Sequence, residues 1–245
     1  MTKYFTNIYP VINLYNKPST KSEIVTQLIY GDSFSIFKKT TKWLKVKIKE
    51  DNYIGYIKNK KYSNYLKPSH KVSCLKAKIF KFSSRIKKNE ITFGSKIKVI
   101  DKNSKFFKFA NGWIKKEDVK PVSYKEKNPL RKITYFKNIK YKWGGKSFKG
   151  IDCSALVQVF LNFNNKFCPR DAKDQVKYFR KNVKLKNIKK NDIIYWKGHV
   201  AVALSNKKLI HAYGPMKKTV IMDINQTIKR IERTAKLKVI GIKRL

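Results

Sequence analysis

The feature that most constrains the fold of this sequence is a strand-and-turn pattern that occurs twice in its first half. Short apolar runs of period two, separated by turn residues, fill residues 1–68 and then residues 72–121. Within the second run, Phe93-Gly94-Ser95 repeats the layout of Tyr30-Gly31-Asp32. Alternation with period two predicts half-buried strands, and a pattern that repeats predicts two similar units. We therefore expect two small β-barrels in succession.

The pattern changes from residue 124 onward. A glycine-rich turn is followed by an amphipathic stretch typical of a helix, and then by two strongly apolar runs typical of strands. This order of helix-like and strand-like segments predicts a third domain of the α+β class. The expected boundaries are 1–68, 69–123 and 124–245, and the expected fold class for the whole chain is α+β.

The composition excludes an intrinsically disordered chain, because 42% of the 245 residues are apolar and 13% are aromatic. No run approaches the length of a membrane span, so no span is expected. The first twenty residues lack the continuous apolar core of a secretory signal, which predicts a cytoplasmic protein. Three cysteines are too few for a disulfide framework in a chain this long, so we expect reduced thiols.

The net charge of +44 comes almost entirely from lysine, with 52 Lys against 7 Arg. The lysines occur in every segment, and the chain is also rich in Ile, Asn, Phe and Tyr, a composition typical of an AT-rich coding sequence. Arginine is the side chain that forks onto phosphates and base edges, and it is scarce here. No specific nucleic-acid partner is therefore predicted, although a basic module that binds anionic polymers remains a non-enzymatic alternative. Small anionic peptides should be attracted to this surface.

Cys153 stands where a reactive thiol is expected. A Gly-Gly loop precedes it, Asp152 is suited to the helix N-cap, and Leu156, Val159 and Phe160 give the following helix a buried face. A thiol at a helix N-terminus is close to unpaired backbone N–H groups, which favour the thiolate and predict a lowered pKa. The alternative is a buried structural cysteine, which is our interpretation of Cys74 and Cys168.

A thiol nucleophile needs a base, and the chain has only three histidines. His70 lies in the link between the two repeats, whereas His199 and His211 lie in two apolar runs joined by a short turn. A three-residue loop would pair residue 203 with 207 and so place His199 opposite His211. His199 would then deprotonate Cys153, and His211 would orient the His199 ring. A zinc site formed by the same three residues is the alternative, but no CxxC or HExxH spacing supports it.

Taken in order, five segments of the last domain resemble the motifs of the NlpC-type cysteine peptidases of bacterial cell walls. They are Tyr141–Gln158, Cys168–Gln175, Lys190–Trp196, His199-Val200-Ala201 and Ile210-His211-Ala212. The resemblance implies a papain-like fold, no cofactor, and hydrolysis of murein peptides by a triad of Cys153, His199 and His211. It also implies that the hydroxyl of Tyr141 and the backbone N–H of Cys153 stabilise the tetrahedral oxyanion.

The first repeat is similar to the SH3-like domain of bacterial dipeptidyl-peptidases, on the strength of Val25–Asp32, Trp43 and Asp51–Ile57. Together with the second repeat, this implies SH3-like barrels in front of the catalytic domain. The combination implies hydrolysis of the γ-D-glutamyl-L-diamino acid bond in short peptides with a free N-terminal L-Ala. The diamino acid would be meso-diaminopimelate or Lys.

The same resemblance implies a set of substrate-binding residues. Asp152 and Ser154 match the positions that meet the substrate amine and D-glutamate, and Arg170 could hold a carboxylate through a bidentate pair. From the first barrel, the candidates are Asp32 or Asp51 together with Tyr53 or Tyr56, with Asp32 and Tyr56 as our first choice.

Three departures from the family pattern are visible, and none removes a catalytic group. Ala155, Ala172 and Asn191 stand where Gly, Ser and Gly are usual. An alternative function is hydrolysis of the intact cell wall, with the basic barrels as wall-binding modules.

Overall fold

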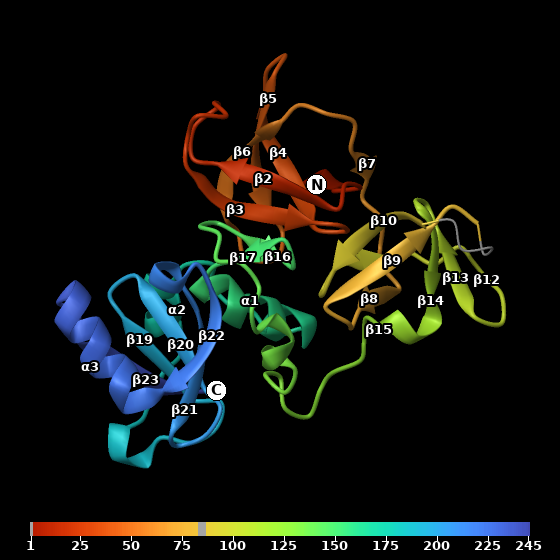
Figure 1. Ribbon diagram of the computed structural model, residues 1–245. Coiled ribbons are helices and arrows are strands. Elements are labelled where there is room, and N and C mark those ends of the chain that lie inside the picture. Colours follow the sequence, from red (N-terminus) through yellow and green to blue (C-terminus); the bar gives the residue numbers. More distant parts are fainter. Residues whose placement is uncertain (1, 83–86) are drawn as a thin grey trace.

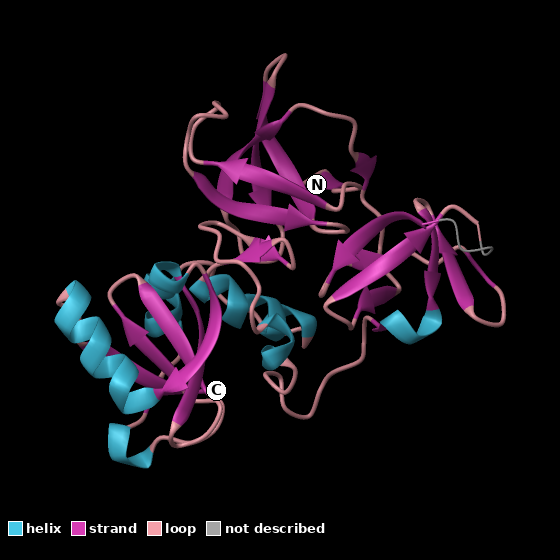
Figure 2. Cartoon of the chain, viewed as in Figure 1, coloured by secondary structure: helices cyan, strands magenta, loops and turns pink. Residues whose placement is uncertain are grey.

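The computed structural model describes residues 2–82 and 87–245 and arranges them as three units in chain order. Two β-rich units, coloured red to orange and yellow to green in Figure 1, lie beside a helix-containing unit coloured green to blue. Figure 2 shows that almost all helical structure belongs to this last unit. The fold is therefore a sheet-rich α+β fold, as predicted.

The first unit is built on one sheet with the strand order β3-β2-β6-β5-β4-β1-β7. The apolar side of the sheet encloses a core that includes Leu14, Leu28, Phe34 and Val46. Its strands are β1 (Tyr4–Thr6), β2 (Val11–Tyr15), β3 (Ile24–Ile29), β4 (Ser33–Lys39), β5 (Trp43–Ile48), β6 (Ile54–Lys58) and β7 (Ser63–Asn64).

The second unit has two smaller sheets, ordered β10-β9-β14-β13-β12 and β11-β8-β15. Its strands are β8 (His70–Val72), β9 (Lys76–Phe80), β10 (Lys87–Thr92), β11 (Lys96–Ile97), β12 (Asp101–Lys102), β13 (Phe106–Phe109), β14 (Gly112–Lys115) and β15 (Val119–Pro121), with a 3-10 turn at Lys116–Asp118. Residues 83–86 of this unit lie outside the described part of the chain.

The two units share the local geometry that the sequence repeat predicts. Gly31 and Gly94 both have positive φ, at 84° and 81°, where a residue without a Cβ is least strained. The following hairpins also match, because β5–β6 pairs Val46 with Gly55 while β13–β14 pairs Phe109 with Gly112. The turn and the hairpin therefore repeat, with a shorter connection in the second copy.

The third unit is a sheet with the strand order β18-β23-β19-β20-β21-β22 and packed helices. Its helices are α1 (Cys153–Phe163), α2 (Ala172–Tyr178) and α3 (Ile224–Ala235), with 3-10 turns at Ile133–Phe136, Leu185–Asn187 and Gly214–Met216. Its strands are β16 (Lys146–Ser147), β17 (Gly150–Ile151), β18 (Lys181–Asn182), β19 (Ile193–Trp196), β20 (His199–Ala203), β21 (Lys208–Tyr213), β22 (Lys218–Asp223) and β23 (Val239–Arg244).

The central strand β19 is buried on both faces and divides the core of this unit in two. Ile193 and Tyr195 join the cluster around α1, whereas Ile194 and Trp196 join the cluster around α3. This division follows from the period of two along a strand. It explains why the segment has a continuous apolar sequence rather than an alternating one.

The hairpin formed by β20 and β21 has a different register from the predicted one. Ala203 pairs with Leu209 rather than with Lys207, because the turn is longer and its closing hydrogen bond joins Leu204 to Lys208. The shift is two residues, so each side chain keeps its face. Helix α3 was not predicted, although the spacing of its isoleucines after Asp223 is helical.

Within the described residues, no helix is long and apolar enough to cross a membrane.

Candidate active site

Cys153 begins α1, as the sequence predicts. Asp152 has an extended conformation, and its Oδ1 accepts a hydrogen bond from the backbone N–H of Ala155 at 2.8 Å, which makes it the N-cap. The helix packs against β20 and β21, and the thiol is only 5% exposed. The sulfur lies against the backbone N–H groups of Ser154 and Val200, so it sits beside the strand that carries His199.

The helix cap is tied to Arg170. The guanidinium donates to both carboxylate oxygens of Asp152, at 3.1 Å and 2.5 Å, and also to the hydroxyl of Ser154 at 2.9 Å. Its Nε donates to Thr26 of the first unit at 2.7 Å. Burial alone would lower the pKa of Arg170, but the Asp152 carboxylate more than compensates and raises it. Arg170 thus forms the predicted bidentate pair, but with a carboxylate of the protein itself.

The thiol of Cys153 does not have the lowered pKa that its helix position predicts. Its pKa is raised to about 12, chiefly by burial and also by the negative charge of Asp152, against the lowering effect of the nearby backbone N–H groups and Arg170. Removal from water is the larger effect here. In the free protein at neutral pH the thiol is therefore protonated.

His199 and His211 are brought together, as predicted, and their rings meet edge to face. His199 Nε2 lies 2.9 Å from His211 Nδ1, and the ring centroids are 5.1 Å apart. The His211 ring is fully buried and stacks on Tyr213 at 4.6 Å with an interplanar angle of 11°. Burial lowers the pKa of His199 to about 4 and that of His211 to about 3. Both rings are consequently neutral at pH 7.

The hydrogen-bond network assigns the tautomers of both rings. His211 Nε2 lies 3.4 Å from Met222 Sδ, and a thioether can only accept, so Nε2 carries the hydrogen. His211 Nδ1 is then a bare acceptor and receives the Nε2–H of His199. This leaves the lone pair on His199 Nδ1 free to take a proton. The apolar pattern does not predict the role of Met222, which lies in β22, a strand beyond the two predicted apolar runs.

Tyr141 lies within electrostatic range of the nucleophile. Burial raises the pKa of its hydroxyl, and the charges of Cys153 and Asp152 raise it further, so the phenol remains a hydrogen-bond donor at any physiological pH. Its backbone is held by the N–H donated to Lys217 at 2.8 Å and by a bridge to Ile151. The position therefore suits the predicted role beside the thiol.

The first unit contacts α1 and the segment before α2 through polar side chains. Tyr53 donates its hydroxyl to Asp171 at 3.1 Å, and Asp51 accepts from Gln158 of α1 at 2.9 Å. Burial raises the pKa of the Asp171 carboxyl, while Arg170 and the Tyr53 hydroxyl oppose that rise. On the loop before Cys153, Trp143 donates to Glu23 at 2.7 Å.

Two of the predicted substrate-binding residues do not join this group. Asp32 pairs with Lys146 at 3.3 Å and belongs to the junction described below. Tyr56 packs against Lys45 on β5. Of the alternatives considered from sequence, Asp51 contacts Gln158 of α1 and Tyr53 contacts Asp171.

The other thiols differ from Cys153 in their surroundings. All three cysteines are free; Cys74 is half-buried in the second unit, and Cys168 is fully buried behind α1. His70 packs against Phe107 of the second unit. In the described part of the chain, no cluster of three or more His, Cys, Asp or Glu side chains is placed to hold a metal ion.

Comparison with known families assigns two segments of the chain. Residues 138–234 match the NlpC/P60 family, and residues 14–61 match the bacterial dipeptidyl-peptidase SH3 domain. The chain thus combines an NlpC/P60 domain with an SH3 domain of this type. These matches indicate a cysteine-type peptidase.

Individual relatives agree with this assignment. The chain is 26% identical over 242 residues to the γ-D-glutamyl-L-lysine dipeptidyl-peptidase of Bacillus subtilis (strain 168), covering 88% of this chain and 81% of the relative. It is 36% identical over 72 residues to dipeptidyl-peptidase 6 of Lysinibacillus sphaericus, covering 29% and 27%. Its fold matches the crystal structure of an NlpC/P60 family protein from Bacillus cereus ATCC 10987, with a TM-score of 0.81, 17% identity, and coverage of 98% and 99%.

Proposed function

We propose that this chain hydrolyses the γ-D-glutamyl-L-diamino acid bond of short murein peptides that carry a free N-terminal L-Ala. The observation that carries the proposal is the contact of the first unit with α1, the helix that begins at Cys153, and with the segment beside its cap, through Asp51–Gln158 and Tyr53–Asp171. A wall at this position limits the length of peptide that fits N-terminal to the cleaved bond. The similarity to a dipeptidyl-peptidase along most of the chain supports the same substrate class.

In the proposed mechanism, Cys153 and His199 begin as a neutral pair. When the peptide carbonyl lies against the sulfur, His199 Nδ1 takes the thiol proton while the sulfur attacks the γ-carbonyl carbon. His211 accepts the Nε2–H of His199 and holds that ring in the tautomer needed for this transfer. The imidazolium then protonates the leaving amine of the diamino acid. Water hydrolyses the thioester to release the dipeptide.

The oxyanion formed in both steps needs donors that are already in place. The Tyr141 hydroxyl and the backbone N–H of Cys153 at the start of α1 are the groups we assign to it. Because the Tyr141 pKa is raised, the phenol donates rather than ionises. One such donor contributes on the order of 10²–10³ in kcat.

Recognition of the free amine is assigned to Asp171 rather than to Asp152. The Asp152 carboxylate is occupied by Arg170, Ser154 and the helix N-terminus. Asp171 is half-buried, and among the described side chains Tyr53 is its hydrogen-bond donor, so its carboxylate has lone pairs left for an ammonium group. Acetylation of the peptide would leave that carboxylate unpaired and exclude the substrate.

The second β-rich unit is included in the proposal as another SH3-like module. The repeated turn at Gly94 and the hairpin register at Gly112 support this relation to the first unit. We further propose that the protein acts in the cytoplasm on peptides released from the wall, consistent with three free thiols.

Mass spectrometry tests the proposal directly. The purified protein is incubated with L-Ala-γ-D-Glu-meso-diaminopimelate and with its N-acetylated form, and the Cys153→Ser variant serves as the control. We expect cleavage of the free-amine peptide only, and none by the variant. Equal cleavage of both peptides, together with release of fragments from intact cell walls, would instead favour the wall-hydrolase alternative.

A further inference from the structure

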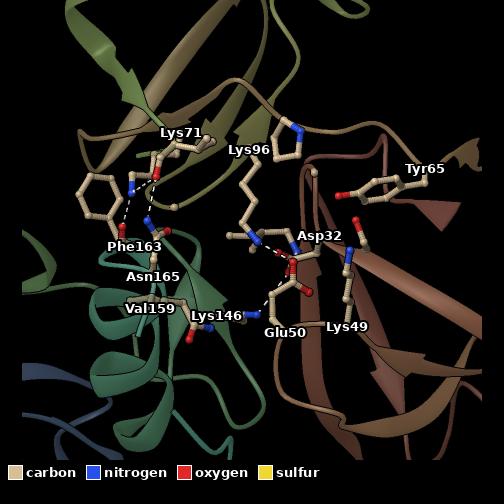
Figure 3. A pocket seen from close by; sticks show the side chains of 17 residues that line it. Asp32, Lys49, Glu50, Tyr65, Lys71, Lys96, Lys146, Val159, Phe163 and Asn165 are labelled. Atoms are coloured by element: carbon tan, nitrogen blue, oxygen red, sulfur yellow. Dashed lines mark hydrogen bonds and ion pairs between the residues drawn. The ribbon is translucent and has the colours of Figure 1, made fainter. Parts of the chain in front are cut away.

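A cavity lies where all three units meet, beside the C-terminal half of α1 and away from its thiol end. It has a volume of about 330 Å³. Its walls come from the first unit through Asp32 and Glu50, from the second unit through Lys96, and from the catalytic unit through Lys146 and Val159 (Figure 3). None of the catalytic residues proposed above lines it, so it is separate from the active site.

Negative and positive side chains alternate along the wall of the cavity, in the order Glu50, Lys96, Asp32 and Lys146. Glu50 Oε1 pairs with Lys96 Nζ at 2.5 Å, and Asp32 Oδ2 pairs with Lys146 Nζ at 3.3 Å. Asp32 also lies within electrostatic range of Lys96. Asp32 and Lys146 are almost fully buried, so the charges are held in fixed positions rather than on mobile surface side chains. Figure 3 shows both pairs converging on the same space.

The positive charges of the cavity exceed the negative ones. Besides Lys96 and Lys146, the lining includes Lys49 and Lys71, so four ammonium groups face two carboxylates. The ammonium group of Lys71 donates its three hydrogens to the carbonyls of Val122, Tyr124 and Phe163, at N···O distances of 2.9, 2.6 and 2.5 Å. Lys71 therefore contributes positive charge to the cavity but has no N–H left to donate to a ligand. Burial and the nearby charges of Lys96 and Lys125 lower the pKa of Lys71 to about 8.

Two groups at the cavity lack the partner that their chemistry requires. Glu50 Oε2 is buried and accepts no hydrogen bond within the described structure. Lys49 Nζ has only ring faces as described partners, at 4.9 Å from Tyr4 and 4.4 Å from Tyr65. A buried acceptor and an available cation thus face one space. A ligand that satisfies both must carry a hydrogen-bond donor and an anion.

From this arrangement we propose that the junction cavity binds a small peptide that carries carboxylates and a free ammonium group. The carboxylates pair with Lys49 and Lys96, the ammonium group meets Glu50 Oε2, and an aliphatic side chain packs on Val159. The size of the cavity is at the lower end for small-molecule sites and suits a dipeptide. Two carboxylates and one ammonium group give the net negative charge that the excess lysines require.

The dipeptide L-Ala-D-Glu has this pattern of charges, and its choice as the probe rests on the proposed function, of which it is a product. Binding is measured by two-dimensional ¹⁵N–¹H NMR on the full-length Cys153→Ser protein. Gly31 and Gly94 line the cavity, whereas Gly145 precedes the nucleophile in the loop after Tyr141, so the backbone amides of these glycines report the two sites separately.

We expect saturable shifts of the Gly31 and Gly94 signals with the dipeptide, and affinity on the order of tenfold weaker in Lys49→Met. Lys39→Met is the matched control, because Lys39 is exposed on β4 outside the cavity, and it should bind as tightly as the parent. Glu50→Gln should bind the free and N-acetylated dipeptides equally.

The proposal is overturned if the shifts are confined to Gly145, if Lys49→Met binds as well as Lys39→Met, or if acetate alone at equal concentration shifts Gly31 and Gly94 to the same extent. The experiment also separates failure of the cavity site from failure of the proposed peptidase activity. Peptide cleavage by the wild-type protein without these shifts refutes only the cavity site, whereas shifts without cleavage refute only the dipeptidyl-peptidase activity.

Discussion

The two β-rich units repeat one turn and one hairpin, yet they differ in the side chains that reach the catalytic unit. The first unit makes polar contacts, whereas the second adds an aromatic ring to the core around α1 beside the polar contacts of Lys71. In the first unit, the Tyr53 hydroxyl donates to Asp171 and the Thr26 hydroxyl accepts from Arg170. The second unit inserts Phe93, which lies 4.6 Å from Phe163 and 4.7 Å from Phe160, into the core around α1. A shared local geometry therefore does not fix the role of a unit. The side chains on the contacting face do.

The difference predicts that the second unit stabilises the fold while the first unit selects the substrate. Phe93 is 1% exposed, and it follows β10 directly. Phe93→Ala should lower the free energy of unfolding by about 3–5 kcal/mol, since it leaves a cavity in the catalytic core. Urea denaturation followed by circular dichroism measures this loss, with kcat/KM at low temperature nearly unchanged. Ile100→Ala, at an exposed site, is the control, and an equal effect of both would remove the distinction.

The acid sensitivity of the protein should be located in the catalytic unit rather than in the second β-rich unit. His211 has a pKa of about 3 when folded and an ordinary pKa of 6.5 when unfolded, so its contribution to stability is present above pH 6.5 and is lost as pH falls below it. Between pH 7 and pH 4.5, the free energy of unfolding of His211→Asn should fall by about 2 kcal/mol less than that of the wild-type protein. Urea titrations at both pH values measure it.

The matched variant for this test is His70→Asn in the second unit. Burial also lowers the pKa of His70, but this ring is only half-buried and lies against Phe107. His70→Asn should change the pH dependence of the free energy of unfolding less than His211→Asn does. A larger effect for His70 would place the acid-sensitive region outside the catalytic unit.

The contribution of the first unit to substrate recognition is expected to rest on a single hydroxyl. Tyr53→Phe removes the donor to Asp171 and should lower kcat/KM for the free-amine peptide about tenfold, because a hydrogen bond to a charged group is lost. The free energy of unfolding of Tyr53→Phe should differ from that of the wild-type protein by less than about 1 kcal/mol. Tyr56→Phe is the control in the same strand region and should leave kcat/KM unchanged. If the two variants behave alike, the first unit does not select the substrate through Tyr53.

The smallest effect is expected within the catalytic unit itself. Met222→Leu keeps the volume of the side chain but removes the acceptor for His211 Nε2–H, so the tautomer assignment loses one weak hydrogen bond. We expect kcat/KM to fall about two- to threefold. Imidazole ¹⁵N shifts should show a mixture of His211 tautomers, which a purely structural role would not produce. The exposed Met216→Leu should change neither quantity.

Features that depend on neighbouring residues could be predicted from the sequence. Asp152 caps α1 because N-capping needs only an acceptor three residues before a free N–H. The start of the helix at Cys153 follows from the same rule. Likewise, β5 (Trp43–Ile48) alternates half-buried and buried side chains, as the period of two in the first half predicts for its strands.

Features that depend on distant contacts could not be predicted in this way. Arg170 was expected to hold a ligand carboxylate, but it holds Asp152, a pairing that chain folding alone brings about. The Cys153 pKa was expected to fall because the helix dipole is local, whereas the burial that raises it comes from the strands packed over α1. The hairpin register was wrong by two residues because the turn length is not encoded in the apolar pattern, although Ala203 and its neighbours kept their faces.

The position of Phe93 has a consequence for how this protein can be divided. Its ring belongs by sequence to one unit and by packing to the hydrophobic core of another. A fragment that begins after residue 123 would contain every proposed catalytic side chain and still lack part of its own interior. The segment that carries the chemistry is thus shorter than the segment that must fold together, and we expect the second and third units to unfold as one cooperative body rather than as interchangeable modules.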